Sequence, residues 1–223
     1  MESYIPQAEE KQFCESLELC GVRKNTEGET MMRLKKKSGD FEEIKLSDVV
    51  NKTEYNGKEI ERIYSSGHVF LDEDHKKVFL VTTKKGDKIQ HQFTGGAPLE
   101  DKNKNVIHNV EGGYSFDIEK VRDNARTRTN TRIGVQVTEE YNEKPLVDWA
   151  LMEMVDENSE SYYKLVCLMH FIVKKYEGIL SASGKENAVD AQWYPIENLD
   201  SVDNIAPNAS LVTQKAVEYI SNK

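Results

Sequence analysis

The sequence has 223 residues, which is enough for one large domain or for one domain with a small appendage. Apolar residues make up 38% of the chain and charged residues 31%, as in a globular protein, and the net charge of -9 argues against a wholly basic nucleic-acid coat. No apolar run approaches the roughly 20 residues that cross a bilayer, so we expect no membrane partner.

The cysteines bear on the compartment. Cys14, Cys20 and Cys167 are odd in number and form no C-x-x-C pair, so we expect neither a disulfide framework nor a zinc site. The first ten residues are polar and acidic, unlike a secretory signal peptide. Together these features predict an intracellular protein, with the reducing cytoplasm as its compartment.

The first part of the chain is short of apolar runs. Apolar residues at i, i+4 and i+7 predict a helix over 7–20. The charged, turn-rich stretch that follows predicts a hairpin whose strands are 31–36 and 41–46. We interpret residues 1–60 as an N-terminal extension and 61–223 as the main domain.

Strand patterns begin after Gly67. Apolar, β-branched and aromatic residues predict strands over 68–71 and 77–82, joined by an acidic turn, and a third strand over 89–93. The third strand runs into a pair of glycines. The polar stretch 97–112 is expected to be a loop or an insertion.

A helix is predicted over 115–130. Ile118, Val121 and Ala125 recur at i, i+3 and i+7, and acidic residues lie in the expected first turn. The stretch 126–132 alternates threonine with arginine or asparagine, and threonine is β-branched, so a strand is the alternative there.

The last part of the chain alternates again between strands and a helix. Strands are expected over 134–137, 146–155 and 164–174, the last being a continuous apolar run of the kind found in central strands. Residues 193–195 precede a turn, and 211–220 form an amphipathic helix. This order predicts an α/β fold in which helices cover both faces of a mixed sheet.

Several of these segments resemble the Nudix hydrolase superfamily. In that family two strands and a glycine-rich turn, here QFTGG at 92–96, lead to a helix that carries the box G-xxxxx-E-xxxxxxx-REU-x-EE-x-GU, with U aliphatic. Gly113, Glu119 and Gly134 match that box at the required spacing. An alternative start is Gly95 and Gly96, with 97–113 as an insertion; the helix residues align in the same way.

The resemblance extends toward the C-terminus. The stretch AQWYPIENL at 191–199 is similar to a later strand and turn of the family, so the resemblance covers about 64–220. It implies a Nudix-type α/β/α sandwich with a mixed sheet, plus the N-terminal extension.

The catalytic part of the box departs from the family pattern. Thr127 stands where the family has arginine, and Arg128, Thr131 and Arg132 stand where it has the three carboxylates that hold magnesium. Mg²⁺ prefers hard oxygen ligands, and a guanidinium has no atom with which to bind a cation. We therefore expect no catalytic residue, no metal ligand and no cofactor.

Arginines at these positions indicate a different use of the helix. Arg128 and Arg132 are four residues apart and share one side of a helix, where they could clamp a phosphate or another anion together with Arg126. The alternative is a solvated basic face paired with nearby acids. Arg122 and Arg126 form a second such pair, which favours the surface interpretation, and Glu119 supports the start of the helix.

The leading hypothesis is thus a catalytically inactive Nudix-like protein, a pseudoenzyme. It binds a phosphate-bearing ligand such as RNA or a nucleotide, or it acts as a protein-interaction subunit. The alternative is a divergent active hydrolase of nucleoside diphosphate-linked substrates that rebuilds a magnesium site from other carboxylates. Candidates for that site are Glu100, Asp101, Glu111, Glu139, Glu140 and Glu153. A weaker hypothesis is a structural subunit that docks through residues 1–60.

Overall fold

The computed structural model describes residues 3–4, 23–50, 52–97, 107–110, 113–155, 158–206 and 209–223. The helix expected over 7–20 lies outside these residues. The chain divides into two units. Unit 1 comprises Met1–Ser65, Leu99–Ile118 and Val147–Met169, and unit 2 comprises Ser66–Pro98, Glu119–Leu146 and His170–Lys223. The expected division into 1–60 and 61–223 stays a prediction.

Unit 1 is built on the predicted hairpin. Strand β3 (Thr30–Lys35) pairs antiparallel with β4 (Phe41–Lys45), which confirms that prediction, and β2 (Arg23–Lys24) pairs antiparallel with β3. Strand β13 (Leu146–Val155) runs parallel to β3, with Leu151 opposite Leu34. The short elements η1 (Leu46–Asp48) and β5 (Glu54–Tyr55) follow the hairpin, and β5 pairs with the start of β6 (Lys58–Leu71).

A second, small sheet includes part of the segment 97–112, which was expected to be a loop or an insertion. Strand β10 (Ile107–Val110) pairs antiparallel with β11 (Gly113–Asp117), and β1 (Ser3–Tyr4) pairs with β11 on its other edge. Aromatic Tyr114 and Phe116 alternate with polar residues in β11, a period-two pattern that favours a strand. The helix consequently starts at Ile118, three residues later than expected.

Unit 2 has an antiparallel sheet centred on β7 (Lys77–Lys85). Strand β15 (Ala188–Pro195) pairs with β7 on one edge, and the end of β6 and then β8 (Lys88–Gln92) pair with it as well. Strand β9 (Thr94–Gly96) pairs with β6, and β12 (Gln136–Glu140) pairs with the end of β14 (Ser161–Glu177). The strands predicted over 68–71, 77–82, 89–93 and 164–174 are confirmed, and the strand expected over 134–137 starts two residues later, as β12. The turn after 193–195 is confirmed as well and forms η3 (Ile196–Ser201).

Helix α2 (Ile118–Ile133) confirms the helical prediction through 126–132 and excludes the alternative strand. Its fully buried residues recur at every fourth position and form one stripe along the helix: Val121, Ala125, Thr129 and Ile133. The stripe packs on β6, where Ser66 Oγ donates to the Val121 carbonyl over 2.9 Å and His68 bonds Thr129. The helix is therefore stabilised by tertiary contacts that override the β-propensity of its threonines.

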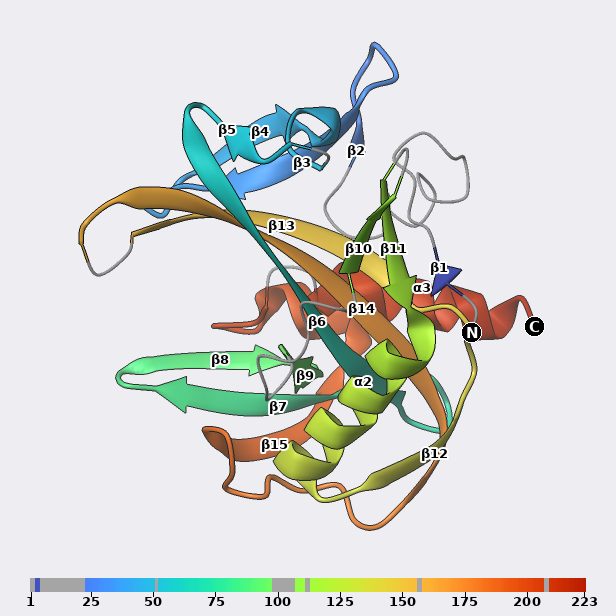
Figure 1. Ribbon diagram of the computed structural model, residues 1–223. Coiled ribbons are helices and arrows are strands. Elements are labelled where there is room, and N and C mark those ends of the chain that lie inside the picture. The colour runs from blue at the N-terminus through green and yellow to red at the C-terminus, as the bar shows by residue number, and fades with distance from the viewer. Residues whose placement is uncertain are drawn as a thin grey trace. The chain divides into compact units, whose positions relative to one another are not determined.

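Helix α3 (Ala209–Ser221) confirms the predicted C-terminal helix. It buries Val212, Thr213 and Ala216. Figure 1 shows α2 in front of the strands of unit 2. Antiparallel pairs, the parallel pair of β13 and β3, and these helices confirm the mixed-sheet α/β class. None of the helices among the described residues is long and apolar enough to span a bilayer.

Two glycines bring β9 against β6 beside α2. Gly67 lies opposite Gly95, and a Cβ on Gly67 would lie 2.2 Å from the Thr94 carbonyl oxygen. The two backbones can approach this closely only because neither residue has a side chain. A third glycine, Gly134, ends α2 with φ of +72° and donates its N–H to the Asn130 carbonyl, as a left-handed C-cap does.

These two kinds of glycine should differ in their tolerance of alanine. Gly67→Ala forces two strands apart and should lower the free energy of unfolding by about 3 kcal/mol. Gly134→Ala meets open space and has only a left-handed backbone to strain, so it should cost about 1 kcal/mol. Urea unfolding of both variants measures the difference, and equal losses would contradict the close approach of β6 and β9.

Candidate functional site

The polar side of α2 carries four arginines in two pairs with i, i+4 spacing. Like charges at this spacing repel each other on a helix. Each pair is neutralised in part by one carboxylate from another element of unit 2: Glu140 at the end of β12 serves the first pair, and Glu186 in the loop between β14 and β15 serves the second. Both clusters are mostly shielded from solvent.

Glu186 lies between Arg128 and Arg132. Arg128 Nη1 is 2.6 Å from Glu186 Oε1, and Arg132 Nε is 3.1 Å from Oε2. The three side chains are only 12%, 13% and 18% exposed, and this burial lowers the pKa of Arg132 while the pairing with Glu186 opposes the shift. The predicted pair does lie together on one side of the helix, but it already holds an anion from its own chain.

Arg128 also contacts the end of β9 and the residue that follows it. Its Nε donates to the Ala97 carbonyl, and a Cβ on Gly96 would lie 3.2 Å from the same Nε. The guanidinium thus lies flat against the backbone that follows β9. The same guanidinium therefore contacts the backbone after β9 through Nε and Glu186 through Nη1.

The turn that carries Glu186 has an unfavourable backbone. Glu186 and Asn187 have φ of 50° and 64°, and the Ala188 N–H donates to the Lys185 carbonyl over 2.9 Å. Two left-handed central residues closed by this hydrogen bond form a type I′ turn, which favours glycine or asparagine and not glutamate. A left-handed L-residue costs roughly 1–2 kcal/mol, so the ion pairs with the two arginines oppose a backbone cost.

The predicted clamp residue Arg126 belongs to the other cluster. Its Nε and Nη2 donate to both oxygens of Glu140 over 2.9 and 2.7 Å, in a bidentate pair. Arg122 Nε approaches the same carboxylate at 3.7 Å. Arg126 therefore does not join Arg128 and Arg132 on Glu186.

Glu140 also ends a buried chain of hydrogen bonds. His68 Nε2 lies 3.3 Å from Glu140 Oε1, His68 Nδ1 lies 2.8 Å from Thr129 Oγ1, and Thr94 Oγ1 lies 2.9 Å from that hydroxyl. Burial raises the pKa of Glu140, yet the hydrogen bonds from His68 and Arg126 outweigh it and lower the pKa to about 2. Burial lowers the pKa of His68, so its imidazole is neutral at pH 7.

The order carboxylate, imidazole, hydroxyl is that of a nucleophilic triad. One neutral tautomer satisfies it, with Nε2–H donating to Glu140 and Nδ1 accepting from the Thr129 hydroxyl. His68 and Thr129 are both 0% exposed, however, so no substrate reaches the hydroxyl. The chain of bonds positions α2 on β6 and β9 and is not a reaction centre.

The other box residues have structural roles. Gly113 begins β11, and Gly134 caps α2. Glu119 is 69% exposed and pairs with Arg122 in the first turns of the helix. Thr127 accepts through its carbonyl the hydroxyl proton of Thr131, an i−4 bond within the helix, and the Thr131 carbonyl accepts from Ser183.

Arg128, Thr131 and Arg132 do not fit a magnesium ion, because two of these side chains are guanidiniums and the third is a threonine. Among the described residues, no three His, Cys, Asp or Glu side chains gather to hold a metal. Of the proposed replacement ligands, Glu139 pairs with Lys174 and Lys175, Glu140 pairs as above, and Glu153 lies in unit 1 with Lys58. Side chains of Glu100, Asp101 and Glu111 lie outside the described residues.

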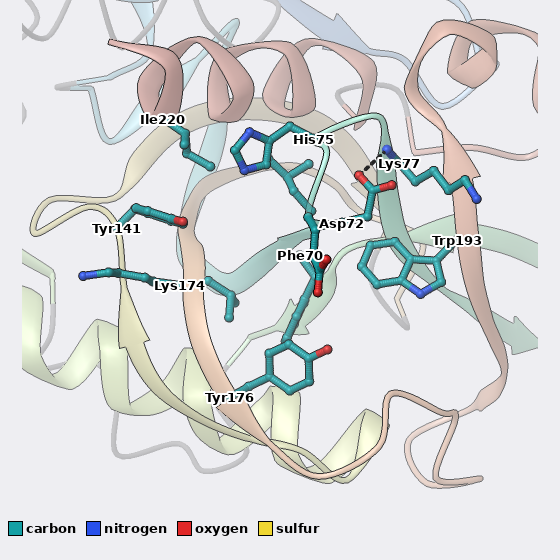
Figure 2. Close-up of a pocket in the computed structure, with 12 residues that line it drawn as sticks. Phe70, Asp72, His75, Lys77, Tyr141, Lys174, Tyr176, Trp193 and Ile220 are labelled. Carbon is teal, nitrogen blue, oxygen red and sulfur yellow. Dashed lines mark hydrogen bonds between the residues drawn. The ribbon is translucent and has the colours of Figure 1, made fainter. Parts of the chain in front are cut away.

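Unit 2 also contains an open pocket of about 590 Å³. Figure 2 shows aromatic rings from different strands around it, with Trp193, Tyr176, Tyr141 and His75 on its sides and Phe70 near its centre. No motif in the sequence indicates this pocket. The aromatic residues that line it are far apart in the chain, and aromatic residues in strands are more often core than ligand-binding.

The partners of the arginines were missed as well. The stretch SGKEN at 183–187 has the composition of a turn. Nothing in that composition indicates that its glutamate contacts α2, because Glu186 and Arg132 are 54 residues apart in the sequence. The hydrogen bonds of His68 could not be predicted from the sequence either, because the residues that form this chain of bonds come from four separate segments. The helix register, in contrast, was available from the box spacing.

Comparison with known proteins finds matches among solved structures. No protein-family model and no curated protein matches the chain. The solved structures that it matches include Nudix and MutT hydrolases. The Escherichia coli ORF135 protein is 13% identical, with a TM-score of 0.44, over 74% of this chain and 94% of that one. A MutT Nudix hydrolase from Burkholderia pseudomallei is 10% identical, with a TM-score of 0.43, over 72% and 98%.

A second buried histidine makes the stability of the fold sensitive to acid. His170 packs edge-on against Phe93 at 5.0 Å between ring centroids, and its Nδ1 has no hydrogen-bond partner among the described residues. Burial, and then the neighbouring His68, lower the pKa of His170 to about 4. The unfolded chain takes up a proton near pH 6.5, whereas the folded protein does so only near pH 4.

Stability should therefore be complete above about pH 6.5 and fall as the pH drops toward 4. The contribution of His170 to that loss is about 3 kcal/mol, since its pKa is depressed by between two and three units. His170→Leu should remove this part of the pH dependence and leave the part that is due to His68, whose pKa burial also lowers. Urea midpoints of both proteins at pH 7 and pH 5 provide the measurement, and parallel losses in the two proteins would show that His170 is not the cause.

Proposed function

We propose that the protein is a Nudix-like domain that binds a phosphate-bearing ligand, such as a nucleotide or RNA, at Arg128 and Arg132 and does not hydrolyse it. The observation that carries this proposal is the position of Glu186, an anion that is already held by both arginines. The site accepts an anion in its present geometry, and the anion comes from a strained turn.

The charges of the cluster favour a stronger anion. Two guanidiniums contribute +2 and Glu186 contributes -1, so the cluster keeps a net positive charge in surroundings that are only 12–18% exposed. A phosphate carries more charge and more acceptor oxygens than a carboxylate and pairs with guanidinium bidentately. It can therefore replace Glu186, and the release of the left-handed turn favours the exchange.

The proposed family is supported by the chain's own residues. Two strands and a glycine-rich turn precede α2, the box glycine Gly134 caps it, and its 16 residues include the positions that carry carboxylates in the box. Arg128 and Arg132 occupy two of these positions and point to an anion directly. In this proposal no metal bridges the helix and the phosphate.

Hydrolysis is the first test. Incubation with nucleoside diphosphate derivatives, dinucleoside polyphosphates and capped RNA, in Mg²⁺ or Mn²⁺, should give no turnover above the buffer, because the positions that bind metal hold guanidiniums and a threonine. Turnover that disappears when a chelator is added would overturn the proposal and support a hydrolase with replacement ligands.

Anion binding is the second test, with pyrophosphate and short RNA as probes and EDTA present. Wild-type affinity should weaken as salt rises, because the attraction is in part screened charge. Glu186→Gln removes the competing charge, so it should bind roughly tenfold more tightly while its Tm without ligand falls. Glu197→Gln, at an exposed acid elsewhere, should do neither.

The opposite change completes the design. The double variant Arg128→Gln, Arg132→Gln should lose binding, whereas Lys84→Gln with Lys88→Gln removes the same charge from exposed strands and should retain it. Circular dichroism establishes that both variants are folded. Equal affinity in the two double variants, or no gain in Glu186→Gln, would contradict an anion site at this pair.

A further inference from the structure

The open pocket of unit 2 is a second candidate site, and it differs in chemistry from the arginine pair. Four rings form a continuous array, and three of them line the pocket. Tyr176 meets Phe70 at 5.4 Å between centroids, Phe70 meets Phe79 at 6.3 Å, and Phe79 meets Trp193 at 5.3 Å, all edge to face. Phe70 and Phe79 are 1% and 2% exposed, so the core fixes the positions of the outer two rings.

The outer rings are available to a ligand. Tyr176 is 42% exposed although it is a large aromatic residue, and Trp193 and Tyr141 are half-buried. In Figure 2 the rings of Tyr176 and Trp193 lie on different sides of Phe70, and Tyr141 and His75 border the same space. A volume of about 590 Å³ is in the range of small-molecule sites.

The lysines of the lining do not make the pocket basic. Lys174 Nζ pairs with Glu139, and Figure 2 shows its ammonium at the outer edge, turned away from the rings. The side chain of Lys77 also extends away from the centre in that view. The acidic residues Asp72 and Glu73 belong to the same lining.

Asp72 is held in place by the turn between β6 and β7. Its Oδ1 accepts the N–H groups of Lys76 and Lys77 over 2.7 and 2.8 Å. A fixed carboxylate next to aromatic rings is the combination that stabilises an organic cation, because a ring face attracts positive charge through its quadrupole. The net charge of -9 on the chain also attracts a positively charged ligand.

We propose that this pocket binds a small organic cation, a methyl-substituted ammonium compound, through the rings of Trp193 and Tyr176 and the carboxylates of Asp72 and Glu73. A substituted ammonium has no strong need for hydrogen bonds, so rings can replace its hydration shell. A phosphate-bearing anion is disfavoured by the carboxylates. The site is thus independent of the arginine pair, which selects the opposite charge.

A pair of ligands with the same shape isolates the charge. Choline and 3,3-dimethyl-1-butanol differ in that a quaternary nitrogen replaces a carbon. Choline, titrated with the full chain and followed by calorimetry and tryptophan fluorescence, should bind roughly tenfold more tightly than the neutral alcohol. Equal affinity for the two, or tighter binding of adenosine monophosphate than of choline, would overturn the proposal.

Variants at an exposed ring keep the test clear of folding effects. Tyr176→Phe retains the ring and should bind choline within about twofold of wild type, whereas Tyr176→Leu should lose at least about fivefold. Glu73→Gln should weaken choline and leave the neutral alcohol unchanged. Val189→Thr, at an exposed residue outside the lining, is the control. No difference between the Phe and Leu variants would reject the role of the ring.

Discussion

The interaction on which unit 2 depends is the sharing of one carboxylate by two arginines, which occurs twice along α2. The helix has four arginines at positions that repel in pairs, and its threonines favour a strand. It would be a poor helix in isolation. Glu140 and Glu186 reach it from β12 and from the loop before β15, and they turn a repulsive face into two networks that link the helix to the rest of unit 2.

The two networks have different consequences. Glu140 is 6% exposed, is bonded to His68 and Arg126, and continues into two buried threonine hydroxyls, so every member has a partner and the arrangement is fixed. Glu186 is attached only through a type I′ turn with two left-handed residues. The first network therefore positions the helix, and the second supplies the replaceable anion on which the proposed function rests. Removing one partner of either network leaves a shielded charge without compensation, which is strongly destabilising.

The sequence predicted the local structure of unit 2 well and its partnerships poorly. Strands β7 and β8 and the end of β6 followed from strand-forming residues and turn residues, and β15 followed from the resemblance of 191–199 to the family. The register of α2 followed from box spacing and from Ile118, Val121 and Ala125. The hairpin of β10 and β11 was missed, because its polar composition outweighed the alternation of Tyr114 and Phe116. Periodicity shows which face a residue occupies on its own element. It does not show that Glu186 meets Arg128 and Arg132, or that Tyr176 and Trp193 border one pocket.

The most direct measurement of the central claim is NMR of the arginine Nε–H signals of Arg128 and Arg132 while pyrophosphate is added without divalent metal. Each signal reports the partner of its own guanidinium. If phosphate oxygens replace Glu186, both signals should shift together with a single dissociation constant, while the signal of Arg126, which is paired with Glu140, stays in place. Signals of Arg128 and Arg132 that do not move at concentrations where the protein binds pyrophosphate would contradict it.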